Sequence, residues 1–477
     1  MGLKKNIAYS GLLTVSLYIL QFITFPYVAR VLGVANIGIY DFCYSYVNIF
    51  LLVSSFGISV YGIREVAKAN SHEEKLNQTF TTLFSYNALL TTISIILYIV
   101  IWLSSDNLKQ YNKLLASGII ILLSNLFVVE WLFRGVEDFK YVTYRTLSLR
   151  VIYCLSVFIF VREQDDYDTY FYLSVLLVLA NALINWHYKN RYVTFHRISF
   201  RGIRSVIAPS VLVGGYVFLS SYYSNILPVI LGSLFDNTQV GLYVTASKLI
   251  IIIIMLFGAY TLALIPRLSS YNASNQVDLS KSILAKSYCL VMLFIVPCIF
   301  FVGLYADDII LFIAGPGYEE AAGLMRLCLP ILFISGINQI NVSQVLLPKG
   351  KDKYILFIYM LALPSGLLIN YLLSFYLKAE SSVISWVFIE FLICIISSQK
   401  IYKDEQVNVL NFLPWKAAIL FLPLLSLLYF SNFVRGSFVN ICIGIVFILI
   451  WTHFTYKYIL KDDIYISIVE KLTKKTL

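Results

Sequence analysis

Long apolar stretches alternate with short polar connections along almost the whole of this 477-residue chain. A helix needs about 20 predominantly apolar residues to cross the hydrocarbon layer of a membrane. The sequence holds about 14 such stretches, which predicts an all-α polytopic membrane protein with about 14 transmembrane helices. The predicted spans are 6–31, 36–62, 79–103, 114–134, 144–161, 169–188, 206–232, 238–265, 283–304, 322–347, 354–376, 382–399, 414–431 and 437–459.

The turn between the first two spans is repeated later in the chain. The repeat aligns segment 21–47 with a segment around residue 231, through the pairs Leu32 and Leu231, Gly33 and Gly232, Gly38 and Gly241, and Tyr40 and Tyr243. Two similar charged turns, 134–141 and 349–354, follow the fourth and the tenth span. The repeats predict two six-helix lobes, 1–190 and 206–400, joined by a linker at 191–205. Residues 401–477 would add the last two helices and a basic cytoplasmic tail.

The distribution of lysine and arginine predicts the orientation of the chain. If the predicted spans alternate, 27 of the 36 basic residues fall on the side of the N-terminus and seven on the other side. The positive-inside rule then places both termini in the cytoplasm. The first apolar run is too long for a cleaved signal peptide, so we expect it to remain as a helix.

Composition supports a membrane protein and argues against a nucleic-acid partner. Apolar residues make up 59% of the chain and charged residues only 13%, whereas a soluble protein usually carries about 25% charge. The net charge of +10 has no soluble domain to carry it, so we expect contact with anionic membrane lipids. The basic linker 191–205 fits either an amphipathic segment in the membrane interface or a solvated loop.

The sequence contains no established enzyme motif. Nucleotide-binding glycine loops, the His-Glu-x-x-His metalloprotease pattern and the Gly-x-Ser-x-Gly elbow are all missing. The seven cysteines lie in apolar runs without metal-ligand spacing. We therefore expect no catalytic residue, no metal and no cofactor, and a monomeric transport unit rather than an enzyme.

Basic residues within the spans are candidates for function, because each costs a few kcal/mol in mid-bilayer unless it is paired or hydrated. Lys248 has no acidic residue three or four positions away, so we expect it to face water or an anion. Arg30, near the outer end of the first span, is a second candidate, with an interface anchor as the alternative. Arg150 lies near the end of its span, where its side chain is expected to reach the inner interface.

Acidic residues within the spans have other expected roles. Asp41 and Glu390 are candidates for a counter-charge or for carrying a coupling ion. For Glu390, a structural partner on a neighbouring helix is the alternative. Glu130 lies four residues before Arg134, a spacing that predicts an ion pair on one helix face.

Four segments together resemble the Wzx-type polysaccharide-unit flippases of the multidrug, oligosaccharidyl-lipid and polysaccharide exporter superfamily. They are FPYVARVLGVANIGIYDF at 25–42, LGSLFDNTQVGLYVTASKLI at 231–250, AGPGYEEAAGLMRLCLPILF at 314–333 and QVLLPKGKDKYILFIYMLALPSGLLINYLL at 344–373. Their order and spacing carry the resemblance. It implies two six-helix lobes around a central cavity, plus a trailing helix pair, working by alternating access.

The resemblance also implies the cargo, an undecaprenyl-pyrophosphate-linked oligosaccharide that is moved from the inner to the outer leaflet of the bacterial plasma membrane. Such a step serves the synthesis of O-antigen or capsule. A pyrophosphate that crosses a bilayer needs basic partners to offset its desolvation. Arg30 and Lys248 are the expected substrate-binding residues, with Arg326 as a third. Coupling to H⁺ or Na⁺ stays open.

Three other functions remain as alternatives. A multidrug exporter of the same superfamily usually carries an acidic residue in its first helix, and the first span here has none. An O-antigen polymerase or ligase needs a sizeable outer loop, whereas the outer loops predicted here have about 4 to 18 residues. A lipid II flippase would carry a cargo with the same pyrophosphate-lipid group.

Overall fold

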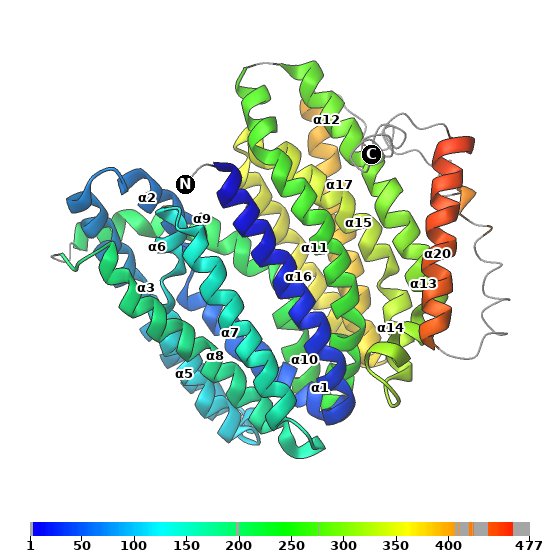
Figure 1. Ribbon diagram of the computed structural model, residues 1–477, viewed down its shortest axis with the longest axis horizontal. Coiled ribbons are helices and arrows are strands. Elements are labelled where there is room, and N and C mark those ends of the chain that lie inside the picture. The colour runs from blue at the N-terminus through cyan, green and yellow to red at the C-terminus, as the bar shows by residue number, and fades with distance from the viewer. Residues whose placement is uncertain are drawn as a thin grey trace. The chain divides into compact units, whose positions relative to one another are not determined.

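The computed structural model describes residues 3–196, 200–274, 276–405, 409, 419–421, 423 and 437–460. Every regular element within these ranges is a helix (Figure 1). The chain is therefore an all-α polytopic membrane protein, as the apolar pattern predicted. Most of the predicted span 414–431, part of the predicted linker 191–205 and the basic tail beyond residue 460 lie outside the described residues.

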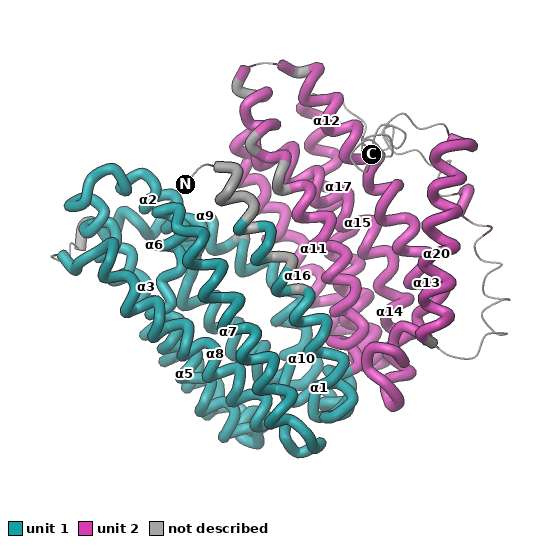
Figure 2. Tube along the Cα trace, viewed as in Figure 1, with its two compact units in different colours: residues 1–241 teal, residues 242–477 magenta. Residues whose placement is uncertain are grey.

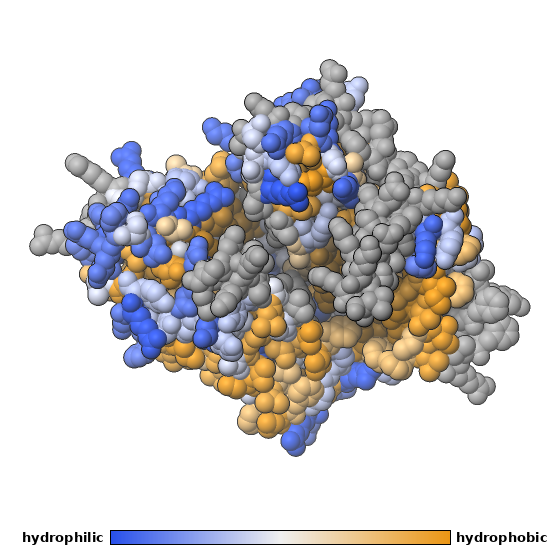
Figure 3. Space-filling view, turned by 45° about the horizontal axis from the view of Figure 1, so that its top comes forward, coloured by the Kyte–Doolittle hydropathy of each residue, from blue (hydrophilic) through white to orange (hydrophobic). Residues whose placement is uncertain are grey.

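Twelve helical segments of the described residues are long and apolar enough to cross a membrane. The first of them, Ile19–Ala69, takes in the predicted span 36–62 and the second half of 6–31. Many large apolar side chains on these segments are exposed, among them Leu183 and Leu449 at 64% each. Figure 3 shows hydrophobic residues gathered across the lower part of one face and hydrophilic residues mainly along its upper part and at its lower tip. These surfaces suit contact with lipid tails rather than water.

The first long helix, α1 (Leu3–Ser54), is broken at Gly33. Gly33 has φ 75° and ψ 171°, which residues with a Cβ rarely adopt. The break lies between the predicted spans 6–31 and 36–62, so the sequence located this turn correctly. A single glycine therefore separates the first two spans.

Residues 1–241 form the first of two compact units (Figure 2). Within it, α5 packs against α8, α8 against α7, and α7 against α1. After α1, unit 1 contains α2 (Ile58–Ala69), α3 (Glu73–Ser104), α4 (Asp106–Lys109), α5 (Asn112–Val128), α6 (Glu130–Gly135), α7 (Phe139–Phe160), α8 (Tyr167–Tyr188), α9 (Phe200–Ser220), α10 (Leu227–Leu234) and the start of α11 (Asn237–Ala273). Three short helices join them, η1 (Gln164–Asp166), η2 (Lys189–Arg191) and η3 (Tyr222–Ile226).

Residues 242–477 form the second unit, which begins within α11. Its α16 packs on α17, α15 on α17, and α13 on α20. The described helices after α11 are α12 (Val277–Leu290), α13 (Val296–Ile313), α14 (Glu319–Leu327), α15 (Leu329–Gln339), α16 (Asp352–Ser374), α17 (Lys378–Glu405) and α20 (Ser437–Phe454). Wider π-helical turns lie between α12 and α13 at η4 (Val291–Ile295), after α15 at η5 (Ile340–Leu346) and after α20 at η9 (Thr455–Ile459). A short 3₁₀ turn, η6 (Leu347–Lys349), directly follows η5.

The two copies of the repeated turn pack directly against each other within unit 1. A Cβ on Gly38 would lie 1.7 Å from the backbone oxygen of Asn237 and 3.1 Å from the backbone nitrogen of Gly241. A Cβ on Gly241 would in turn lie 2.1 Å from the backbone oxygen of Val34. The repeated glycines therefore allow two backbones to approach more closely than any other residue type would permit.

Replacing Gly38 by alanine should force these backbones apart and lower the stability of the protein. We expect a loss of roughly 1–3 kcal/mol or more, the cost of overpacking a tight contact, measured as a lower thermal unfolding midpoint in detergent. Gly323→Ala on α14 is the matched control, since no atom lies within 4 Å of a Cβ built there. Equal midpoints for the two variants would show that the Gly38 contact is unimportant.

Candidate functional site

The candidate residues of the first unit lie on either side of the break in α1. Arg30 is exposed one turn before Gly33, and Asp41 is half-buried about two turns after it. The break thus lies between a positive and a negative side chain of the same helix. Lys248 is half-buried on the part of α11 that belongs to unit 2.

A group of tyrosines from three helices meets at Ser174 of α8. The hydroxyl of Tyr40 on α1 lies 2.9 Å from Ser174 Oγ, and that of Tyr153 on α7 lies 3.1 Å from the same atom. The Tyr170 ring lies 4.2 Å from the Tyr40 ring, centroid to centroid, and the Tyr44 ring stacks on Tyr40 at 5.5 Å. We call these five residues the tyrosine cluster.

Two opposite charges border the tyrosine cluster, because Asp41 follows Tyr40 directly on α1 and Arg150 lies three residues before Tyr153 on α7. Rings, hydroxyls and charges of both signs are suited to polar, hydroxylated ligands. The sequence pattern pointed to Asp41 but not to the tyrosines. One signal could have found them, since Tyr40 and Tyr44 are four residues apart and share a face of α1.

Arg326 of α14 already has partners in the protein. Its guanidinium makes two hydrogen bonds to the carboxylate of Asp307 on α13, and its Nε donates to the backbone oxygen of Gly303 at 3.2 Å. Bidentate pairs of this type are among the stronger polar contacts in proteins. A phosphate group could bind Arg326 only by displacing or sharing Asp307.

Glu390 of α17 is held by an uncharged neighbour. Asn338 Nδ2 on α15 donates to Glu390 Oε2 at 2.6 Å and to the backbone oxygen of Glu390 at 2.8 Å. Ser335 and Trp386 are its other polar neighbours. A carboxylate among amide, hydroxyl and indole groups is a reasonable place to accept a proton or a small cation.

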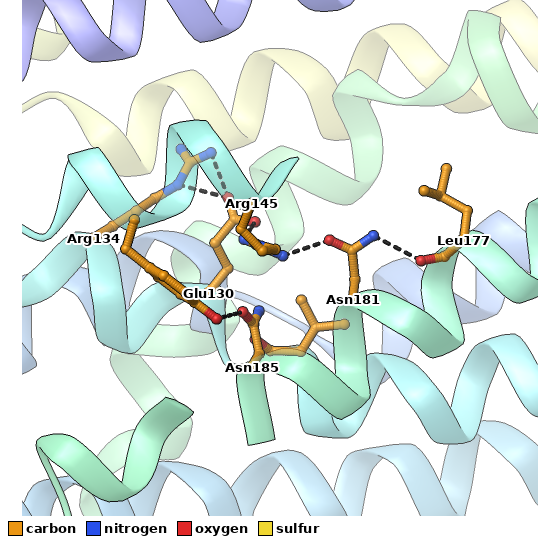
Figure 4. A network of polar contacts seen from close by, with 8 residues as sticks. Glu130, Arg134, Arg145, Leu177, Asn181 and Asn185 are labelled. Atoms are coloured by element: carbon orange, nitrogen blue, oxygen red, sulfur yellow. Dashed lines mark hydrogen bonds and ion pairs between the residues drawn. The ribbon is translucent and has the colours of Figure 1, made fainter. Parts of the chain in front are cut away.

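Glu130 is the centre of an ion-pair network in unit 1 (Figure 4). Arg134 Nε donates to Glu130 Oε1 at 2.8 Å, which confirms the predicted pair. The guanidinium of Arg145 on α7 also binds Glu130, at Oε2 and 3.0 Å, and donates to Asn181 Oδ1 at 2.5 Å. Arg145 is buried, with only 4% of its side chain exposed. One carboxylate thus forms ion pairs with two arginines.

Removing the Glu130 carboxylate should leave the buried Arg145 without its charge partner. Breaking a buried ion pair in this way typically costs about 3–5 kcal/mol. We therefore expect Glu130→Ala to lower the free energy of unfolding by about that amount, measured by an unfolding titration with denaturing detergent in mixed micelles. Glu65→Ala is the control, because it removes an exposed ion pair with Lys68 and should change stability little. Similar effects of the two variants would contradict the network's structural role.

Comparisons of the sequence with known proteins give matches to one family and to two similar relatives. The sequence profile of a family described as "Polysaccharide biosynthesis protein" matches residues 3–272, more than half of the chain. A "Putative O-antigen transporter" from Escherichia coli (strain K12) is 27% identical over 372 residues, covering 74% of this chain and 85% of that protein. A protein of the same description from Shigella dysenteriae is 26% identical, covering 82% and 98% of the two chains.

A solved structure shares the fold. The lipid II flippase MurJ in an inward closed conformation superposes with a TM-score of 0.74 and 14% sequence identity, covering 95% of this chain and 100% of that chain. At that identity the likeness shows a common fold only.

Proposed function

The chain belongs to the polysaccharide biosynthesis protein family, and we propose that it is a flippase for lipid-linked oligosaccharides. Its cargo would be an undecaprenyl-pyrophosphate-linked oligosaccharide, moved from the inner to the outer leaflet by alternating access for O-antigen or capsule synthesis. The observation that carries this proposal is the similarity to O-antigen transporters over 74% and 82% of the chain. In this role the protein transports and does not catalyse a reaction.

The chain is a multi-pass protein of the bacterial inner membrane. We propose that both termini lie in the cytoplasm, because that orientation places most of the basic residues inside. The six-helix lobes 1–190 and 206–400 are the proposed moving parts. Their bounds differ from those of the two compact units, which meet after Gly241. The transport unit would be one copy of the chain.

Arg30 and Lys248 are the proposed partners of the cargo's pyrophosphate. Two phosphate groups lose their hydration when they enter a bilayer, and basic side chains can replace part of it. Arg326 is a weaker third candidate, because its guanidinium already binds the carboxylate of Asp307.

Asp41 and Glu390 are the proposed sites of coupling to H⁺ or Na⁺, if transport uses an ion gradient. Asn338 supports this role for Glu390, since its amide can hold the carboxylate in place while a proton or cation is exchanged.

Deleting the gene should stop export and leave undecaprenyl-linked oligosaccharide on the inner leaflet. Surface polysaccharide should disappear and return with the wild-type gene, measured by gel analysis of the polysaccharide and by mass spectrometry of the lipid fraction. Unchanged polysaccharide combined with greater drug sensitivity would replace this function by that of a multidrug exporter.

Changing Lys248 to alanine should lower export in the complemented deletion strain while the amount of protein in the membrane stays the same. Loss of one cation that binds a phosphate group typically costs about 1.5–3 kcal/mol, or about a ten- to hundredfold loss of affinity. Lys248→Arg should retain part of the export activity. Lys281→Ala is the control, since Lys281 is an exposed lysine of α12. A large fall in abundance for Lys248→Ala would instead make Lys248 a residue required for folding.

A further inference from the structure

The turn from Gly232 to Gly241, which we call the long turn, joins α10 to α11. It is longer than the turn that it repeats, because eight residues lie between Gly232 and Gly241 and only four between Gly33 and Gly38. The long turn belongs to the proposed lobe 206–400, yet it is part of unit 1 and α10 packs against α1 (Figure 1). A segment of one proposed lobe is thus held by helices of the other.

Two uncharged side chains of the lobe 1–190 bind the long turn. Asn107 Nδ2 on α4 donates to the backbone oxygen of Ser233 at 2.9 Å. The hydroxyl of Tyr111, directly before α5, donates to Asn237 Oδ1 at 3.0 Å and accepts from its Nδ2 at 2.7 Å. Hydrogen bonds between neutral groups contribute little net stability, so they can form and break during a transport cycle.

Tight backbone contacts accompany these hydrogen bonds. A Cβ on Gly232 would lie 2.2 Å from the ring of Phe42, and the Phe42 ring lies 5.4 Å from the Tyr111 ring, centroid to centroid. At Gly38 the backbone of Asn237 leaves no room for a single methyl group. A gap too narrow for one carbon atom cannot admit a sugar or a phosphate group. In this structure no path for cargo therefore exists between α1 and the start of α11 at this end of unit 1.

The long turn keeps its own shape through local hydrogen bonds. The backbone N–H of Phe235 donates to the oxygen of Leu231 at 2.8 Å, where α10 ends. The carboxylate of Asp236 accepts from the backbone N–H of Gln239 at 3.0 Å and so caps the start of α11. These bonds need not break when the turn leaves α4 and α5. The long turn can therefore move as one piece.

We propose that the long turn is an outer latch, which closes the outer end of the protein on α1, α4 and α5 and must leave them before the cargo reaches the outer leaflet. The inference rests on the proposed flippase function and on its orientation, which puts this turn on the outer side. Alternating access moves lobe 206–400 relative to lobe 1–190. That movement must break the hydrogen bonds of Asn107 and Tyr111 with the turn.

A reversible cross-link across the latch tests the proposal in cells. The full-length protein with Asn107→Cys and Ser233→Cys is treated with a short bifunctional thiol reagent that reduction cleaves. We expect the link to lower the appearance of new surface polysaccharide at least tenfold, and reduction to restore it. Mass spectrometry of the linked peptides measures how much of the protein is cross-linked.

A second cysteine pair provides the matched control. Asn36 Nδ2 donates to the backbone oxygen of Gln164 at 2.8 Å, a bond of the same type that lies wholly within lobe 1–190. Linking Asn36→Cys to Gln164→Cys should leave export unchanged. Export that continues with the latch linked, or that stops equally with the control pair linked, would overturn the proposal.

Opening of the latch can also be measured without transport. Val240 is fully buried and shares a helix face with Asn237 and Gly241, so a cysteine at this position reports release of the turn. In purified full-length Val240→Cys in lipid nanodiscs, Tyr111→Phe should raise the rate at which a maleimide labels residue 240. The expected increase is about two- to tenfold, the effect of losing one neutral hydrogen bond.

Tyr27→Phe is the control for the labelling measurement. The hydroxyl of Tyr27 donates to the backbone oxygen of Val161 at 2.7 Å, within lobe 1–190, so its loss should leave the labelling rate unchanged. Equal labelling rates with and without Tyr111→Phe would show that the Tyr111 hydroxyl does not hold the turn, and the proposal would fall.

The gene deletion distinguishes this inference from the function on which it rests. If deletion blocks export of lipid-linked oligosaccharide but a linked latch does not, the latch is wrong and the flippase function stands. If deletion leaves export unchanged while Tyr111→Phe still speeds labelling, the flippase function is wrong and the opening of the turn stands.

Discussion

Within a membrane no water can bind the backbone, so wherever a helix is interrupted the protein itself must supply the missing hydrogen bonds. Asn185 does so for the carbonyl of Val128 next to the break between α5 and α6. Side-chain hydroxyls also bond to backbone carbonyls of other helices, as Ser94 does with Phe50 at 2.7 Å and Tyr98 with Leu115 at 2.7 Å. Such bonds link helices that apolar contacts alone would leave free to slide, because lipid tails are as apolar as leucine.

The same constraint explains how the described ionic groups are arranged. Arg145 is buried and shares Glu130 with Arg134, while Arg326 binds Asp307. The contact with Glu130 offsets the cost of removing the charge of Arg145 from water. An anionic cargo that reaches such an arginine must therefore offer an interaction at least as favourable as the carboxylate it replaces.

The repeated turns have a structural role that their sequence similarity did not reveal. Gly38 and Gly241 occupy equivalent positions in the two copies and lie against one another at backbone distance. A side chain at either position would collide with a backbone atom, so this contact depends on the absence of a Cβ. The chain passes from unit 1 to unit 2 directly after Gly241.

The sequence by itself determined most of the described membrane-spanning segments, the break at Gly33 and the pair between Glu130 and Arg134. All three are local properties, set by the length of an apolar run, the freedom of glycine and the spacing of one helical turn. Tertiary structure alone decided that Arg145 joins Glu130, that Arg326 meets Asp307, and that Tyr40 and Tyr153 meet at Ser174. A helix in lipid is apolar on nearly every side, so its sequence does not say which face turns inward, and only packing against other helices settles that.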